Sequence, residues 1–279
     1  MSADDFRRAS LTNWQTIARG WERRRAELDE IAAPVREWLV RSLAPQEGET
    51  ILELAAGPGD TGFSAAALLG EDGRLITSDF APAMIEVARR RAAELGLDNV
   101  EFRVLDAHEL ELDDDSVDGV ICCFGFMLMA DPAAALAETR RVLRPGGRLV
   151  FAVWRAADQN PWVSLSARVL VDHGLMAPTE AGSPGAFALA SDDRVQAVLD
   201  GAGFRDVRID DVPVRHMYAD IDEYVAAARQ TMGAFATAFD GASEEQQRAV
   251  IDELHVAFAP FATADGIELP GLALVAVAS

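Results

Sequence analysis

The sequence predicts an α/β fold built on a doubly wound, mostly parallel sheet. Strand-like and helix-like segments alternate between residues 50 and 154, which implies right-handed βαβ units with helices on both faces of the sheet. The segment 117–124 is apolar throughout, as expected of a strand that is buried on both faces. A glycine-rich turn follows the first predicted strand, at the edge where sheets of this kind bind ligands.

The central elements are expected in regular order. Short apolar runs bounded by polar or turn residues predict five strands, at 50–54, 74–78, 100–105, 117–124 and 148–154. Helices are expected at 61–69, 83–95 and 131–143. Arg144-Pro145-Gly146-Gly147 ends the last of these helices.

The flanking segments are predicted to be mainly helical. Apolar residues recur at spacings of three, four and seven over 11–43, where Pro34 is expected to break the helix or to begin a second one. After residue 155 the pattern loosens, and helices are expected at 161–175, 191–202, 220–239 and 243–259, with a loop at 176–189. Two more strands, at 204–218 and 272–278, complete a sheet of seven.

Composition excludes several classes of function. The net charge of −21 repels phosphate and argues against a nucleic-acid substrate. The chain contains no lysine, so it has none for a Schiff base, a P-loop, a kinase site or a Tyr–Lys dehydrogenase pair. No apolar run approaches the ~20 residues that cross a bilayer, and the charged N-terminal segment does not resemble a signal peptide. We therefore expect a cytoplasmic protein without a membrane span.

The two cysteines, Cys122 and Cys123, are adjacent in an apolar strand. They offer no spaced set for disulfides or for a metal site, which fits a reducing compartment. No basic residue nearby lowers the pKa of either thiol, so both are predicted to pack in the core rather than to act as nucleophiles. No metal site is predicted.

The strongest local signal is Ile51-Leu-Glu-Leu-Ala-Ala-Gly-Pro-Gly-Asp-Thr-Gly62, a strand that ends in a glycine-rich turn and opens a helix. Gly57 and Gly59 allow a sharp turn and a close approach of the backbone to a ligand. Asp79 follows Gly59 by 20 residues, at the end of the second strand, where an acid can hold ribose hydroxyl groups. The pattern predicts an adenosine-type cofactor, and its spelling also matches the fingerprint of NAD(P)-dependent oxidoreductases.

Two carboxylates distinguish these alternatives. Glu53 lies inside the first strand, where it can meet a cationic amino group, whereas a pyrophosphate gains nothing from a nearby carboxylate. Asp106-Ala107 ends the third strand, where a carboxylate can accept a hydrogen bond from adenine N6 and the next amide can donate to the ring. No later motif supplies hydride-transfer machinery, so a nicotinamide cofactor is the second interpretation.

These motifs resemble the class I S-adenosylmethionine-dependent methyltransferases, in particular the ubiquinone/menaquinone-methyltransferase-like branch of small-molecule type. The resemblance covers roughly residues 48–155. It rests on five motifs in register, namely Glu53-Leu-Ala-Ala-Gly-Pro-Gly59, Ser78-Asp79-Phe80-Ala-Pro-Ala-Met84, Asp106-Ala107, Asp115-Ser116-Val117-Asp118 leading to Phe124-Gly125, and Arg141-Val-Leu-Arg-Pro-Gly-Gly147. It implies a Rossmann-like, seven-stranded sheet whose last strand is antiparallel, with a helical cap.

The resemblance also implies a division of the chain. Residues 1–45 would form an N-terminal helical cap or lid, and residues 46–155 the S-adenosylmethionine-binding core. Residues 156–190 would be a helical insertion or cap, and residues 191–279 would complete the core sheet, with a helical insertion at 220–259. Caps of this kind decide which acceptor is methylated.

The resemblance implies a role at the cofactor site for each of the matching residues. They are Glu53, Ala55, Gly57 and Gly59 at the methionine end, Asp79 at the ribose, Phe80 and Met84 on the faces of the adenine, Asp106 and Ala107 at its edge, and Phe124 beside the sulfonium. The implied reaction is an in-line transfer of the methyl group to a small acceptor, expected to be hydrophobic or aromatic because the predicted cap is apolar.

The acceptor is predicted to lie between the segment 124–127, which ends at Met127, and the N-terminal helix that carries Trp14 and Trp21, with Trp162 also lining the pocket. His108, next to the cofactor motif, is the candidate general base, although a histidine that only lines the site is the other interpretation. His216 is a second candidate. A protein that binds S-adenosylmethionine without turnover is a further alternative.

Overall fold

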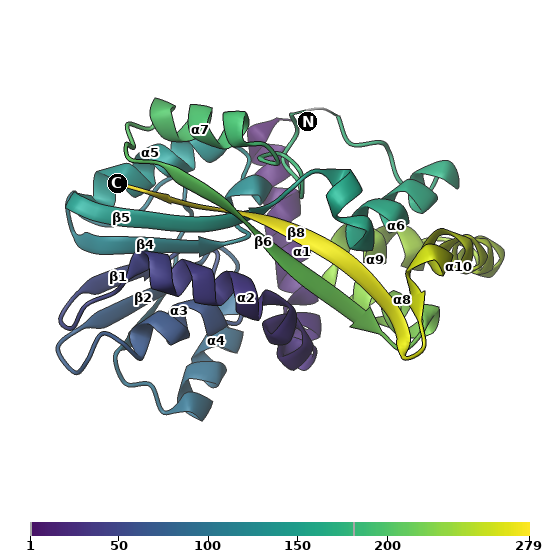
Figure 1. The fold of residues 1–279 in the computed structure, drawn as a ribbon, viewed down its shortest axis with the longest axis horizontal. Helices are drawn as coiled ribbons and strands as arrows, with labels where there is room; N and C mark the ends of the chain where they lie inside the picture. Colours follow the sequence, from purple (N-terminus) through teal and green to yellow (C-terminus); the bar gives the residue numbers. More distant parts are fainter. Residues whose placement is uncertain (1, 181) are drawn as a thin grey trace.

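A mixed sheet of eight strands forms the centre of the computed structural model, which describes residues 2–180 and 182–279 (Figure 1). The order is β3-β2-β1-β4-β5-β8-β6, and the short β7 pairs with β8. β1 to β5 are parallel, and β8 runs antiparallel to both β5 and β6, which confirms the Rossmann-like sheet with an antiparallel last strand. The strands are β1 (Thr50–Glu53), β2 (Arg74–Asp79), β3 (Val100–Val104), β4 (Val117–Cys123), β5 (Leu143–Trp154), β6 (Arg208–Tyr218), β7 (Ala262–Thr263) and β8 (Gly266–Ala278).

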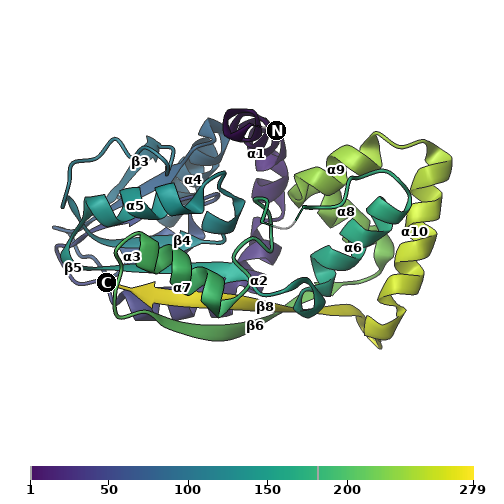
Figure 2. The same cartoon turned by 90° about the horizontal axis from the view of Figure 1, so that it is seen from above.

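Helices cover both faces of the sheet. α2, α3 and α4 pack over one face, and α5 and α7 lie over the other (Figure 1). α6, α8, α9 and α10 gather at one end as a helical lobe, and α1 lies between this lobe and the sheet (Figure 2). The helices are α1 (Ala3–Arg23), α2 (Arg25–Leu43), α3 (Asp60–Ala66), α4 (Pro82–Leu95), α5 (Pro132–Val142), α6 (Pro161–Asp172), α7 (Asp192–Gly201), α8 (Ile221–Thr231), α9 (Gly233–Asp240) and α10 (Glu244–Phe258).

The sheet with its covering helices, the helical lobe and α1 each have a hydrophobic cluster of buried residues. The largest joins the central strands to the helices on both faces, and its members include the fully buried Leu52 and Val150. A second fills the helical lobe around Tyr224, and a third lies beneath α1 around Ile17 and Met84. The lobe therefore has a core of its own. Among the described residues, no helix combines the length and the apolar character that crossing a bilayer requires.

β6 and β8 continue beyond the sheet as a two-stranded ribbon that reaches the helical lobe (Figure 2). β8 pairs with β5 only over 273–278, but with β6 over 267–277. The sequence placed this strand at 272–278 alone, because Pro270-Gly271 is typical of a turn. That prediction was too short, since β8 begins at Gly266, and at Pro270, where it pairs with β6 alone, it tolerates a residue that lacks an N–H group.

Two predictions about helix boundaries were also wrong. The N-terminal helical segment breaks at Arg24, and Pro34 lies inside α2 rather than at a boundary. Pro34 removes one backbone hydrogen bond from the helix, but the buried Val35 and Leu39 hold the part of α2 that follows it against the core. The predicted helix at 220–239 is two helices, because the backbone leaves the helical conformation at Met232.

Asn160 is a fully buried polar residue where β5, β8 and α6 meet. Its Nδ2 donates to the carbonyl oxygens of Arg155 (3.0 Å), Ala156 (3.2 Å) and Leu272 (3.2 Å). Its Oδ1 accepts from the Leu272 amide at 3.0 Å and from Trp162 Nε1 at 3.3 Å. One side chain therefore ties the first turn of α6 to the sheet and orients Trp162.

Replacing this amide by a carboxylate tests that connection. Asn160→Asp keeps the shape but puts an acceptor opposite three carbonyl oxygens, so we expect the free energy of unfolding to fall by about 3 kcal/mol in urea titrations. Asn99→Asp is the matched control, because the Asn99 amide is only partly buried and should lose less than about 1 kcal/mol. Equal losses in the two variants would contradict the interpretation.

Candidate cofactor and acceptor site

A cavity of about 450 Å³ lies at the carboxyl ends of β1 to β5, the edge at which open α/β sheets bind ligands. Loops that follow these strands line one side of it, and residues of α1, α2, α8 and β6 enclose the other. Most of the residues predicted for the site line this cavity, namely Trp14, Trp21, Ala55, Gly57, Asp79, Phe80, Asp106, Ala107, His108, Phe124, Met127 and Trp162.

The turn after β1 needs backbone conformations that few residues adopt. Gly57 and Gly59 have φ of 54° and 89°, and a Cβ on Gly59 would lie 2.4 Å from the Phe63 ring. Ala55 and Phe124 also have positive φ, at 51° and 60°, although neither is a glycine. Residues held in this region cost about 1–3 kcal/mol each and cluster at functional sites. The strained backbone at the ends of β1 and β4 therefore marks this part of the cavity.

Glu53 lies beneath this turn and does not line the cavity. Its carboxylate accepts hydrogen bonds from the Gly62 amide and from Thr77 Oγ1, both at 2.7 Å. The side chain is buried, and burial raises the pKa of Glu53 to about 8. Glu53 thus joins the first turn of α3 to β1 and β2, and its predicted contact with a cofactor amino group stays a prediction.

Asp79 ends β2 and faces the cavity. Its Oδ2 accepts from the Gly57 amide at 3.0 Å, and its Oδ1 accepts from the Ala81 amide at 2.9 Å. Burial raises the pKa of Asp79 to about 6, although these hydrogen bonds oppose the shift. Phe80 lines the cavity next to it, whereas Met84 is fully buried in the cluster beneath α1, so only Phe80 of this predicted pair is placed to touch a ligand.

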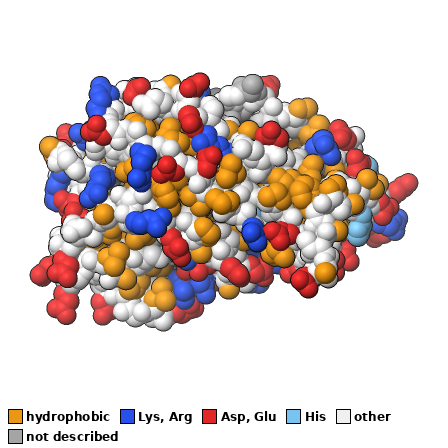
Figure 3. Space-filling model, viewed as in Figure 1, with side chains coloured by type: hydrophobic (Ala, Val, Ile, Leu, Met, Phe, Trp, Pro, Cys, Tyr) orange, Lys and Arg blue, Asp and Glu red, His pale blue; other side chains and the backbone are white. Residues whose placement is uncertain are grey.

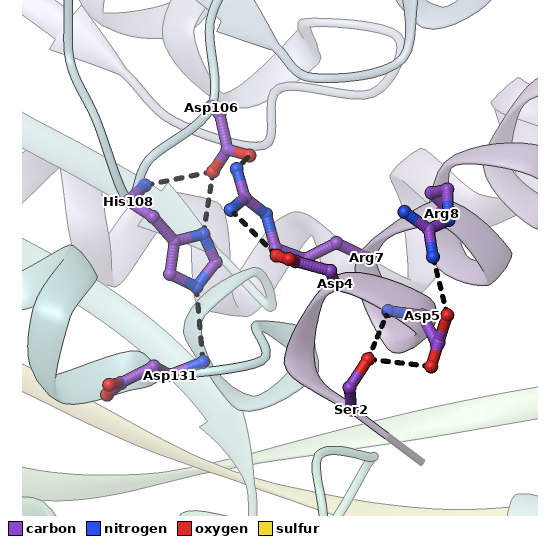
Figure 4. Close-up of polar contacts among 8 residues, drawn as sticks. All are labelled: Ser2, Asp4, Asp5, Arg7, Arg8, Asp106, His108 and Asp131. Carbon is purple, nitrogen blue, oxygen red and sulfur yellow. Dashed lines mark hydrogen bonds and ion pairs between the residues drawn. The ribbon is translucent and has the colours of Figure 1, made fainter.

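Asp106 and His108 form a polar network with α1 (Figure 4). Asp106 Oδ1 accepts from the His108 amide at 2.9 Å and from His108 Nδ1 at 2.6 Å, and Oδ2 is paired with Arg7 of α1. Burial by itself raises the pKa of Asp106, but the bonds from His108 and Arg7 outweigh it and hold that pKa well below its usual range. The Asp131 amide donates to His108 Nε2 at 3.1 Å. Both ring nitrogens are therefore engaged, and His108 presents no free lone pair to the cavity.

The opposite part of the cavity carries an aromatic wall, made of Phe124, Trp154, Trp162 and His216. Phe124 stacks on Trp154 with ring centroids 4.0 Å apart, and Trp154 meets Trp162 edge to face at 5.1 Å. Trp162 then stacks on His216 at 4.3 Å. The wall begins at the residue predicted to lie beside the sulfonium and leads into the helical lobe.

The central part of the chain matches known proteins. Residues 45–177 match the profile of a family described as a methyltransferase domain. The chain contains a methyltransferase domain of the S-adenosylmethionine-dependent family. S-adenosylmethionine is the cofactor of this family, as the motifs after β1, β2 and β3 predict. The family prediction is thus confirmed over the core of the sheet.

Relatives of the methyltransferase domain include a demethylmenaquinone methyltransferase from Clavibacter sepedonicus, which is 48% identical over 40% of this chain and 43% of that protein. The chain thus matches less than half the length of that relative. The YcgJ protein from Bacillus subtilis has a similar fold, with a TM-score of 0.61 at 19% identity over 87% of this chain and 96% of that one. A SAM-dependent methyltransferase from Aquifex aeolicus has a TM-score of 0.50 at 23% identity over 65% and 85% of the two chains.

Sequence reasoning missed three residues that shape the cavity of the methyltransferase domain. Trp154 ends β5, so its place at a strand terminus was a usable signal. Tyr218 lies two residues after His216 on β6 and shares its face of the strand. Arg7 carried no signal, because its partner Asp106 is 99 residues away in the sequence.

Removing the arginine that joins α1 to Asp106 tests the polar network. Arg7→Gln should speed amide hydrogen exchange over residues 3–10 by up to about fivefold and raise the pKa of Asp106, because the ion pair between the two residues is lost. Arg8→Gln is the control, since within residues 2–180 and 182–279 Arg8 forms an ion pair only with Asp5 of its own helix. If the two variants exchanged at the same rate, Arg7 would not hold α1 in place.

The raised pKa of Glu53 predicts how the free energy of unfolding depends on pH. The pKa of Glu53 is about 8 in the folded protein, against an ordinary 4.5, so the folded state binds more protons than the unfolded state between these values. The free energy of unfolding should therefore fall as pH rises from 6 to 8. In Glu53→Gln this part of the fall should disappear, whereas the exposed Glu86→Gln should retain it. Urea midpoints at pH 6, 7 and 8 measure the difference, and an unchanged slope in Glu53→Gln would refute it.

Proposed function

We propose that the protein transfers the methyl group of S-adenosylmethionine to a small, hydrophobic or aromatic acceptor. The observation that carries this proposal is one continuous cavity. It joins the glycine turn and the carboxylates at the strand ends, which suit the cofactor, to the aromatic wall, which suits an acceptor. Its volume of about 450 Å³ supports small molecules as ligands.

The residues present fit the cofactor. Asp79 would receive the ribose hydroxyls, because its carboxylate is buried at the cavity surface and faces no cation there. Phe80 would pack on the adenine, and Asp106 with the Ala107 amide would meet the adenine edge. The positive φ of Ala55 brings the backbone of the turn into the cavity, beside the proposed methionine end.

The cofactor supplies a methyl group that is already activated on a sulfonium, so the chain needs only to align the acceptor and to exclude water. Alignment of this kind can supply ~7–11 kcal/mol of the barrier. Trp21 Nε1 donates to the Thr231 carbonyl at 3.0 Å, which joins α1 to α8 over the cavity, and Trp14 meets Trp21 edge to face at 5.5 Å. These contacts support a site closed to water by α1 and the helical lobe.

The choice of a small apolar acceptor has further support. The demethylmenaquinone methyltransferase relative is named for a quinone, and quinones are flat molecules. On the face shown in Figure 3, arginines are interspersed with acidic side chains, and the net charge is −21, which disfavours nucleic acid. The aromatic wall offers ring surfaces to a flat molecule.

Calorimetry with the purified protein tests the proposal. S-adenosylhomocysteine should bind and NADH should not, because the site has carboxylates where a pyrophosphate would lie. Asp79→Asn should weaken S-adenosylhomocysteine binding by roughly tenfold to a hundredfold, since a charged acceptor of hydrogen bonds is lost. The control Asp72→Asn lies in an exposed loop and should bind as the unaltered protein does.

Three results would count against the proposal: binding of NADH alone, binding of neither ligand, or full affinity in a folded Asp79→Asn variant. A positive result leads to incubation with methyl-labelled cofactor and a panel of small aromatic acceptors. Cofactor binding without transfer to any member of the panel would favour the non-catalytic alternative.

A further inference from the structure

His216 is a buried polar residue with one ring nitrogen, Nε2, that no described residue hydrogen-bonds. It lies on β6 in the ribbon that extends into the helical lobe, and only 4% of its surface is exposed. Among residues 2–180 and 182–279, no group hydrogen-bonds to His216 Nε2, which is itself buried. A buried nitrogen left in this state costs about 1–3 kcal/mol, so it calls for an explanation.

The surroundings of His216 are those of a binding surface. One face of its ring stacks on Trp162, and it lines the same cavity as the proposed cofactor residues. On the neighbouring strand β8, Gly271 has no side chain, and a Cβ there would lie 2.7 Å from Val214 Cγ2 and 3.4 Å from His216 Nε2, so β8 approaches the ring closely at this point. Protein atoms therefore fill the space on the β8 side of the ring, and a polar partner for His216 would have to reach it from the cavity that the ring lines.

The imidazole of His216 is neutral under ordinary conditions. Burial lowers the pKa of His216 to about 3, and no charged group opposes this effect. A neutral ring has one N–H group and one lone pair, so a hydroxyl group, which both donates and accepts, complements it whichever nitrogen holds the proton.

The charges around the cavity are compensated within the protein, apart from Asp79, which the proposed cofactor would engage. The guanidinium groups that line it are paired with carboxylates that also line it, in the pairs Arg7–Asp106, Arg24–Glu27, Arg25–Asp60 and Arg36–Asp29. A charged acceptor would find no uncompensated partner among these groups, and would lose its hydration on entering. The lining thus favours an uncharged ligand.

We infer that the aromatic wall is the acceptor subsite of the proposed methyltransferase, and that it takes an uncharged, planar aromatic molecule whose hydroxyl group hydrogen-bonds to His216. The rings of Trp154 and Trp162 select the flat shape, and His216 selects the hydroxyl. The inference rests on the proposed function, which supplies a cofactor at the Phe124 end of the wall. It assigns His216 a role in specificity, distinct from that of the predicted base His108.

Binding of simple probes to the protein saturated with S-adenosylhomocysteine tests the inference. We expect 2-naphthol to bind about tenfold more tightly than naphthalene, which has the same rings without the hydroxyl, and also more tightly than cyclohexanol, which has the hydroxyl without the rings. In His216→Phe the ring on Trp162 is kept and the nitrogens are lost. That variant should bind naphthalene unchanged and lose the preference for 2-naphthol, and His216→Gln should restore part of it.

The controls separate a failure of the inference from a failure of the proposed function. S-adenosylhomocysteine affinity and the thermal unfolding midpoint are measured first in every variant. His173→Phe is the matched control, because His173 pairs with Glu253 between α6 and α10 and does not line the cavity. If S-adenosylhomocysteine does not bind the unaltered protein, the proposed function is wrong.

If S-adenosylhomocysteine binds normally, two results would overturn the inference alone. One is an unaltered protein that shows no preference for 2-naphthol over naphthalene. The other is a folded His216→Phe variant that retains the preference, or that loses affinity for both probes equally. Loss of the preference in His216→Phe, with no change in His173→Phe, would support it.

Discussion

Two buried carboxylates hold the backbone of the cofactor turn, and the rest of the site depends on them. The Gly62 amide donates to Glu53 and the Gly57 amide donates to Asp79, so both ends of the turn are anchored to β1 and β2. Without these acceptors, the two amides would lose the partners that the protein supplies. Burial raises the pKa of both acids, because their charged forms lose hydration, and the hydrogen bonds from these amides oppose the shift.

The anchored turn determines which neighbouring groups can meet at the cavity. Gly125 lies against the turn so closely that a Cβ there would be 2.7 Å from the Ala55 Cβ. The ends of β1 and β4 can therefore approach only because one of them carries a glycine. This approach brings Phe124 to the cavity, and Phe124 in turn is the first ring of the aromatic wall.

The ribbon of β6 and β8 connects the sheet to the helical lobe. Its register carries His216 and Tyr218 past the end of β5, so residues of an edge strand reach a cavity formed at the ends of the parallel strands. Asn160 fixes the other side of this junction by binding the backbone of β8 and of Arg155, the residue after β5. The acceptor side of the cavity thus depends on contacts between segments more than 100 residues apart in the sequence.

The sequence by itself determined the order of strands and helices in the core, the turn at Gly57 and Gly59, and the acids that end β2 and β3. These features are local, because periodicity, glycine conformation and the position of a residue in a strand act over a few neighbours. Only the tertiary structure decided that Asp131 occupies the lone pair of His108, that Met84 lies beneath α1, and that Trp154, Trp162 and His216 form one wall. Each of these depends on how distant elements pack, and no spacing along the chain records that.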